Sequence, residues 1–408
     1  MKKIINWARA IPSTIRNIPL LIMRWVFTFI PRKKGLWIFD SWRGVRFADN
    51  SKYFFLYAKE QEGITAVWLS REEKIVSQLR NLNIYSEKAN SLKGWWLTMR
   101  AEIVITDCHP LGVNYFLTGG AKVVNLWHAI MLKKVMYDSH RTKKDNFVYA
   151  SKGFKRFIYF LYSPERFFFG NYFLSPGKLW DPLFMSASRL AEDRIIKADY
   201  PRNAIWLEDN PLHSVGADEL NLTRAVSLKE KGSKIIFYMP TFRDGTQNPL
   251  RDSGIDFDKL ENFLETNDAY LFIKFHHEEK RNHEFKRIYF VDTSTDPYPI
   301  MKKTDVLITD YSSVFFDFLF ADRPTIFFAY DLDKYKSEMR EMYFEYDDIT
   351  PGEKVMTFDE LLVALEKTLA GSDGYQKQRE EIKEKVWDKD RIDAGRQELV
   401  NQISALNR

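Results

Sequence analysis

Two series of short apolar runs, separated by segments with helical spacing, constrain the fold of this chain more than any other feature. The first series is 35–39, 66–69, 103–106 and 123–126, and the second is 234–239, 270–275, 306–309 and 325–328. Short apolar runs that alternate with helical segments are typical of parallel α/β units. We therefore expect an α/β protein with two parallel sheets.

One segment of the first series is nearly repeated in the second. Residues 101–107 read AEIVITD and residues 304–310 read TDVLITD, at comparable places in the two series. This match favours two similar Rossmann-like halves. In open parallel sheets, ligands bind at the carboxyl ends of the strands, so polar residues that follow a strand are the candidates for a site.

The chain is expected to have three parts. Prolines and a glycine interrupt the apolar pattern between residues 200 and 216, and we place the joint between the halves there. The parts are then a leader at 1–34, a first domain at 35–210 and a second domain at 211–408. The charged, helical pattern from Gln376 onward is interpreted as a helix that covers the second domain.

The leader holds the excess positive charge of the chain. Its lysines and arginines sum to +8 and no acid occurs before Asp40, so the remainder carries −3 of the total of +5. A mildly acidic body disfavours nucleic-acid binding, which needs a basic surface on the body itself. An anionic membrane is the expected partner of such a leader. Its longest apolar stretch, 18–30, contains Arg24 and is shorter than the ~20 residues that span a bilayer.

Apolar residues of the leader recur at helical spacing. They are Ile4, Ala8, Ile11, Ile15, Ile18, Ile22, Trp25 and Phe29. Basic residues fall roughly opposite this stripe, a pattern of amphipathic segments that lie in a membrane interface. Pro12 and Pro19 interrupt a continuous helix, so we expect two short pieces. The alternative is a stripe that packs on the body of the chain itself.

A second basic region covers residues 131–170. It contains nine basic residues against three acids, hence +6, interleaved with phenylalanines. Two interpretations stay open: a solvated charged face, or a surface that docks on anionic lipid or grips a polyanionic acceptor.

Anion-suited side chains follow four of the expected strands. His128 comes just after the last strand of the first series, with Lys133 and Lys134 close behind. A neutral imidazole is a competent base near pH 7, and the lysines suit an acceptor phosphate. The competing interpretation is a structural histidine that caps a turn.

The second series adds further candidates. Arg243 follows its first strand and offers a planar fork for phosphate oxygens, with a surface pair to Asp244 as an equal alternative. His276 and His277 follow the second strand, and one of the pair is expected to hydrogen-bond phosphate, because adjacent side chains of a strand point to opposite faces. Ser312 and Ser313 follow the third strand at a helix start, where they would bind an anion or simply cap the helix.

Several chemistries are disfavoured by motifs that the sequence lacks. It contains no HxxxH pair and no Cys/His cluster at metal-ligand spacing, so we expect no metal site. It also contains no glycine-rich dinucleotide fingerprint and no Walker loop, which argues against a hydride-transfer enzyme or an NTPase. We expect no cofactor.

Taken in order, these motifs resemble those of the CDP-glycerol glycerophosphotransferase family, the primases and polymerases of teichoic acid and related capsule polymers. The resemblance covers about residues 31–365. Its motifs are PRKK at 31, ADNSK at 48, ITD at 105, NLWH at 125, LKK at 132, YPRN at 200, PTFRD at 240, KFH at 274, DYSS at 310, RP at 323, YD at 330 and PG at 351.

The resemblance implies a GT-B fold, with two Rossmann-like domains and the active site between them. It implies that His128 is the general base for the acceptor hydroxyl and that His276 stabilises phosphate charge. Arg243, Ser312 and Ser313 match positions that hold the donor pyrophosphate. The implied reaction moves glycerol phosphate from CDP-glycerol to a lipid-linked or polymeric glycan acceptor and releases CMP. A peripheral enzyme at the cytoplasmic face of the membrane is expected.

Three positions depart from the family's pattern. Ala129 and Asp199 stand where the family usually has glycine, and His277 stands where it often has proline. These departures leave the identity of the donor and of the acceptor open. CDP-ribitol or a nucleotide sugar is the alternative donor, and a non-catalytic, membrane-bound scaffold that binds polymer is the alternative class.

Overall fold

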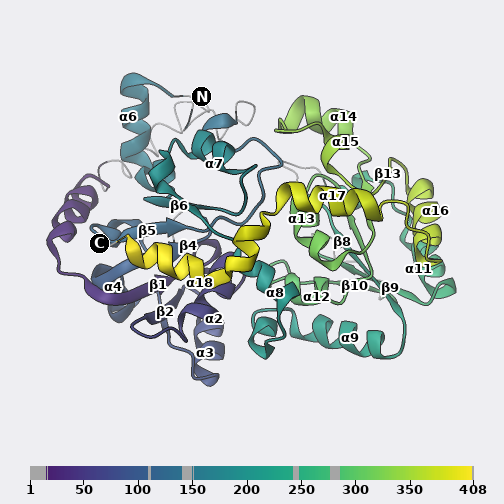
Figure 1. Cartoon of the computed structure of the whole chain (residues 1–408), viewed down its shortest axis with the longest axis horizontal. Helices are drawn as coiled ribbons and strands as arrows, with labels where there is room; N and C mark the ends of the chain where they lie inside the picture. The colour runs from purple at the N-terminus through teal and green to yellow at the C-terminus, as the bar shows by residue number, and fades with distance from the viewer. Residues whose placement is uncertain are drawn as a thin grey trace. The chain divides into compact units, whose positions relative to one another are not determined.

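The computed structural model describes residues 15, 17–108, 112–139, 149, 151–241, 248–275 and 285–406. They form two compact units, each built on one parallel sheet, as the sequence predicts (Figure 1). The first unit comprises the chain up to His128, Val135–Arg202 and the residues from Asp388 onward. The second unit comprises Ala129–Lys134 and Asn203–Trp387.

The sheet of the first unit has the strand order β3-β2-β1-β4-β5-β6-β7. Its strands are β1 (Lys33–Phe39), β2 (Thr65–Ser70), β3 (Ser86–Lys88), β4 (Ala101–Thr106), β5 (Lys122–Asn125), β6 (Tyr172–Ser175) and β7 (Ile195–Lys197). Its helices include α2 (Asp49–Ala58), α3 (Glu73–Asn81), α4 (Leu92–Arg100), α6 (Gly153–Tyr162), α7 (Asp181–Ser188) and α18 (Lys389–Ala405). Buried apolar side chains of β1, β2, β4 and β5, the four strands that the sequence predicts, form the core.

The sheet of the second unit has the order β10-β9-β8-β11-β12-β13. Its strands are β8 (Lys234–Met239), β9 (Ala269–Ile273), β10 (Ile288–Phe290), β11 (Val306–Thr309), β12 (Thr325–Phe328) and β13 (Glu353–Val355). Its helices are α8 (Ala204–Leu207), α9 (Glu219–Glu230), α10 (Pro249–Asp252), α11 (Phe257–Thr266), α12 (Tyr298–Met301), α13 (Val314–Phe318), α14 (Leu332–Lys334), α15 (Tyr346–Ile349), α16 (Phe358–Leu369) and α17 (Gln376–Val386). A capping box between Thr357 and Glu360 starts α16, whose apolar face joins the core.

The strand order reverses at equivalent places in the two sheets, between β1 and β4 and between β8 and β11. The near-repeat of the sequence forms β4 and β11, and each of these strands is followed by an aspartate. Asp107 Oδ1 accepts a hydrogen bond from the backbone N–H of Trp42 at 2.9 Å, and Asp310 Oδ1 accepts one from Thr241 at 2.8 Å. Each carboxylate thus ties together the two loops at the point where ligands bind in such sheets.

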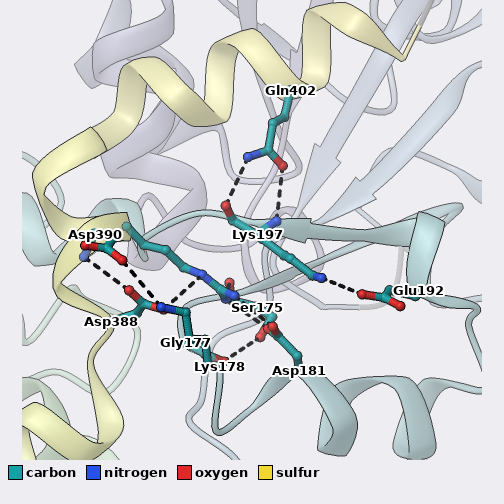
Figure 2. Close-up of polar contacts among 10 residues, drawn as sticks. Ser175, Gly177, Lys178, Asp181, Glu192, Lys197, Asp388, Asp390 and Gln402 are labelled. Carbon is teal, nitrogen blue, oxygen red and sulfur yellow. Dashed lines mark hydrogen bonds and ion pairs between the residues drawn. The ribbon is translucent and has the colours of Figure 1, made fainter.

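The C-terminal helix differs from the sequence-based expectation. It was assigned to the second domain, but α18 belongs to the first unit. Arg391 donates to the Ser175 carbonyl oxygen at 2.9 Å and to Asp181 at 2.7 Å. The Gln402 side-chain amide forms hydrogen bonds with the backbone N–H and the carbonyl oxygen of Lys197 (Figure 2). The reason is specific pairing: the charged residues of the tail include partners for buried groups of the first unit.

The leader is described from Ile15, without residue 16, so the predicted first helical piece lies outside the described residues. Residues 17–26 are helical and are held to the first unit by polar contacts. Asn17 donates to the carbonyl oxygens of Leu161 and Tyr162, and Arg24 donates to Thr118 Oγ1 at 2.8 Å. In the part of the chain that the structure describes, no helix combines the length and apolarity needed to cross a bilayer.

Candidate active site

A turn after β5, one strand from the switch point of the first sheet, places His128. It lies three residues beyond β5, and its Nδ1 lies 2.8 Å from the carbonyl oxygen of Asp107, which follows β4. Because a carbonyl oxygen only accepts hydrogen bonds, Nδ1 carries the proton of the neutral ring. The unprotonated nitrogen is therefore Nε2, the atom available to take a proton from a substrate.

Two indole rings flank this imidazole. The ring centroids of Trp42 and Trp127 lie 4.9 and 4.5 Å from that of His128. The Arg46 guanidinium lies over the Trp42 ring at 4.1 Å. Removal of water from the ring lowers the pKa of His128, and the negative charge of Asp49 partly opposes this effect. The ring is thus neutral near pH 7, the form in which histidine acts as a base.

A buried ion pair lies beside Trp42. Arg202 Nη1 donates to Asp49 Oδ1 at 2.8 Å, and both side chains are almost fully buried. Trp42 Nε1 lies 3.4 Å from the other carboxylate oxygen of Asp49. The pair joins the start of α2 to the YPRN motif.

Two fully buried carboxyl groups lie at the ends of β1 and β4. Burial raises the pKa of Asp40 to about 7, and burial also raises the pKa of Asp107. Gly112 leaves room for Asp40, because a Cβ at this glycine would lie 1.8 Å from Asp40 Oδ2. Across the described residues, no group of three His, Cys, Asp or Glu side chains is arranged to hold a metal ion.

In the second unit, Ser312 and Ser313 lie three and four residues beyond the end of β11 and are partly exposed. Ser312 Oγ accepts a hydrogen bond from the N–H of Val314 at 3.4 Å, and the Ser313 side chain makes no capping bond. The preceding residue, Tyr311, is buried and donates to Asp331 at 2.9 Å. This anchor fixes the loop that presents both serine hydroxyls at the carboxyl end of the sheet.

Lys133 and Lys134 were expected in the first domain, but they belong to the second unit. Lys133 forms an antiparallel bridge with Met342. The Lys134 N–H donates to the Glu341 carbonyl oxygen at 2.9 Å, and Lys134 Nζ lies 3.8 Å from the Glu341 carboxylate. The chain passes into the second unit directly after His128. The phosphate-binding role of the two lysines stays a prediction.

Two further predicted residues, Arg243 and His276, lie outside the described residues. Lys274, in the same motif as His276, is described and has a structural role. Its Nζ donates to the carbonyl oxygens of Asp292 and Thr295 at 2.7 and 2.8 Å. The donor-binding role of Arg243 and the role of His276 therefore stay predictions.

Some residues around His128 were not singled out from the sequence. Asp49, Asn50 and Arg202 lie in the ADNSK and YPRN motifs, which are recognisable in the sequence. The motifs did not indicate which of their residues lie near His128. Trp42 lies outside those motifs and carried no signal. Trp42 follows the end of β1, Asp49 and Asn50 start α2, and Arg202 lies in a 3-10 helix at Pro201–Asn203.

Two Rossmann-like units, each with polar side chains near the switch point of its sheet, give the protein the architecture of the enzymes with a GT-B fold. A sequence profile of the CDP-Glycerol:Poly(glycerophosphate) glycerophosphotransferase family matches residues 22–403. The chain belongs to this family, and the family resemblance of its motifs is thereby confirmed.

Characterised relatives are similar over most of the chain. A teichoic acid poly(glycerol phosphate) polymerase of Bacillus spizizenii is 27% identical over 373 residues, which cover 87% of this chain and 89% of the relative. A teichoic acid glycerol-phosphate transferase of Staphylococcus aureus is 27% identical over 350 residues, covering 82% and 84%. A solved structure of the wall teichoic acid polymerase TagF superposes with a TM-score of 0.70 at 22% identity, covering 99% of both chains, which shows the shared fold.

Proposed function

We propose that this enzyme transfers glycerol phosphate from CDP-glycerol to a hydroxyl group of a teichoic-acid-type acceptor. The observation that carries the proposal is the neutral His128 ring, whose Nδ1 proton is committed to the Asp107 carbonyl oxygen. Such a ring offers Nε2 as a base at the carboxyl end of the first sheet. The family and the two glycerol-phosphate-transferring relatives support the same chemistry.

In the proposed reaction, the acceptor hydroxyl oxygen attacks the β-phosphorus of CDP-glycerol. A new P–O bond forms, the bond from that phosphorus to the oxygen shared with the CMP phosphate breaks, and CMP leaves. His128 takes the hydroxyl proton. Phosphoryl transfer depends mainly on positioning and on stabilisation of charge. We assign that stabilisation to Ser312, Ser313, Arg243 and His276, with Lys133 and Lys134 as candidate phosphate ligands.

The donor is the first point to test. A relative from Staphylococcus aureus that covers 65% of this chain is a ribitol-phosphate polymerase, so CDP-ribitol is the competing donor. We expect acceptor-dependent CMP release from CDP-glycerol to exceed that from CDP-ribitol by at least tenfold, measured with purified protein and lipid-linked acceptors. Faster CMP release from CDP-ribitol, or release of the nucleotide from a nucleotide sugar, would mean that this compound and not CDP-glycerol is the donor. If no donor gave any nucleotide release, the alternative of a non-catalytic scaffold would be favoured.

We further propose that the enzyme lies peripherally on the anionic cytoplasmic face of the membrane. The described part of the leader keeps apolar side chains in solvent, with Trp25 63% and Phe29 70% exposed. Phe154 and Phe157 of α6 are also exposed, and Asn17 joins the leader helix to the end of α6. Exposed aromatic side chains beside basic residues are typical of interfacial binding.

Changing Trp25 and Phe29 to glutamate is expected to weaken binding to phosphatidylglycerol-containing liposomes by at least about tenfold, because two aromatic side chains no longer insert. Co-sedimentation measures the affinity. The matched control is Met356→Glu with Val363→Glu, which alters two exposed apolar residues of the second unit. Equal binding by both double variants would mean that the leader does not contact lipid.

The basic region 131–170 is tested with the same liposomes. Lys152 and Lys155 are exposed, whereas Arg156 donates to the Tyr137 hydroxyl at 2.6 Å. Changing the two lysines to glutamate therefore removes surface charge without breaking this contact. Retained binding would leave a solvated charged face as the interpretation.

A further inference from the structure

The residue that precedes His128 has an unfavourable backbone conformation. Trp127 has a φ of 54°, in the left-handed region that bulky side chains rarely adopt. Three other non-glycine residues near this turn, Trp42, Arg43 and Asp49, also have positive φ values. Such conformations are unfavourable and persist where surrounding contacts fix them, commonly at functional sites.

Two buried asparagines hold the backbone of Trp127 from both sides. Asn125 Oδ1 accepts a hydrogen bond from the Trp127 N–H at 2.8 Å. Asn50 Nδ2 donates to the Trp127 carbonyl oxygen at 2.8 Å and to the Leu126 carbonyl oxygen at 3.2 Å. Both asparagines have no exposed surface. The polar backbone groups of Trp127 are thus bonded by side-chain amides from β5 and α2.

The orientation of each amide is fixed by its other partners. Asn125 Nδ2 donates to the carbonyl oxygens of Cys108 and Phe169 at 2.9 and 2.7 Å. Asn50 Oδ1 accepts from the Arg202 N–H at 3.3 Å. Because each amide nitrogen faces carbonyl oxygens and each amide oxygen faces an N–H, a rotated amide would lose its bonds. The hydrogen bonds therefore allow only one orientation of each of the two side-chain amides.

We propose that Asn50 and Asn125 are positioning residues for His128. By fixing Trp127 in its left-handed conformation, they set the position of the imidazole at which Nδ1 meets the Asp107 carbonyl oxygen. That contact selects the tautomer with the base at Nε2. Neither asparagine contacts the imidazole in this scheme; both act through the backbone of the turn. The inference rests on the proposed function of His128.

The test uses the full-length chain with Asn50→Ala. We expect kcat for CMP release to fall by about 10- to 100-fold, because a misplaced catalytic group costs up to ~10²-fold, while KM for CDP-glycerol stays within about threefold. Nitrogen-15 NMR of the histidine rings reports the tautomer directly, with His128→Ala identifying the signal. In Asn50→Ala, the His128 signals are expected to shift from the pure Nδ1–H form toward a mixture.

Asn221→Ala is the matched control. Asn221 is also buried, and its Nδ2 donates to the Phe290 carbonyl oxygen and to Asp218, both at 2.9 Å, so the substitution removes the same kinds of contact in the second unit. Asn50→Ser, which keeps one donor, provides a milder variant if Asn50→Ala fails to fold, and an intermediate rate and tautomer shift are expected of it.

An unchanged His128 tautomer in the Asn50 variants, or a rate no lower than that of Asn221→Ala, would overturn the proposal. A lower rate with an unchanged tautomer would also overturn it, because the asparagines would then have only a structural role. The tautomer measurement needs no substrate. If His128→Ala kept full activity, the proposed base would be wrong, and the nitrogen spectrum would still decide whether the asparagines position the ring.

Discussion

Replacing His128 with alanine is expected to lower kcat for acceptor-dependent CMP release by about 10²–10⁴-fold, the usual contribution of a positioned base. KM for CDP-glycerol is expected to change little, because the histidine acts on the acceptor hydroxyl and the donor is assigned to the second unit. The measurement is steady-state CMP release. His213→Ala supplies a control, since His213 is a buried histidine of the second unit that pairs with Glu208 at 3.2 Å.

The same assignment predicts a pH dependence. Burial lowers the pKa of His128 below the ordinary histidine value of 6.5. Because the neutral ring is the base, kcat/KM should fall at acidic pH, and the midpoint of this acid limb should lie below pH 6.5. An acid limb that persists unchanged in His128→Ala, or a variant as active as His213→Ala, would assign the base to another group.

Replacing Arg202 with methionine is expected to lower the free energy of unfolding of the first unit by about 3–5 kcal/mol, because a buried carboxylate loses its counter-charge. Arg202 is 1% exposed and donates to Asp49 at 2.8 Å. Urea unfolding followed by tryptophan fluorescence measures the effect. This signal reports mainly on the first unit, since Trp206 and Trp387 are the only tryptophans of the sequence in the second.

The double variant Asp49→Asn with Arg202→Met serves as the control for Arg202→Met. It removes both charges and is expected to recover most of the lost stability, because burial of a neutral pair carries no uncompensated charge. If the single and double variants were equally unstable, packing of the arginine side chain, and not its charge, would be the source of the loss.

The central strands of both sheets were predictable because they are long and apolar enough to show a pattern. The runs 234–239, 306–309 and 325–328 coincide with β8, β11 and β12. Peripheral strands such as β3 and β7 have three residues each and are too short to produce a recognisable period.

The positions of His128 and the two serines were predictable because each lies within four residues of the end of a predicted strand. The contacts around His128 were not, because they depend on tertiary packing. Asn50 and Arg202 are 152 positions apart in the sequence, so no local pattern predicts the hydrogen bond between them. The predicted phosphate-binding role of Lys133 and Lys134 rests on their closeness to His128 in the sequence, although the two lysines belong to the second unit and His128 to the first.

The return of α18 to the first unit affects the order of events during synthesis. β7 is an edge strand, and Gln402 bonds both backbone groups of its last residue, Lys197. Roughly 190 residues separate this strand from α18, so at typical translation speeds the edge stays open for roughly 10–40 s. An uncovered edge is a template for pairing with other chains. The nascent protein is therefore most prone to aggregate in this interval, and chaperones that engage it then should raise its yield.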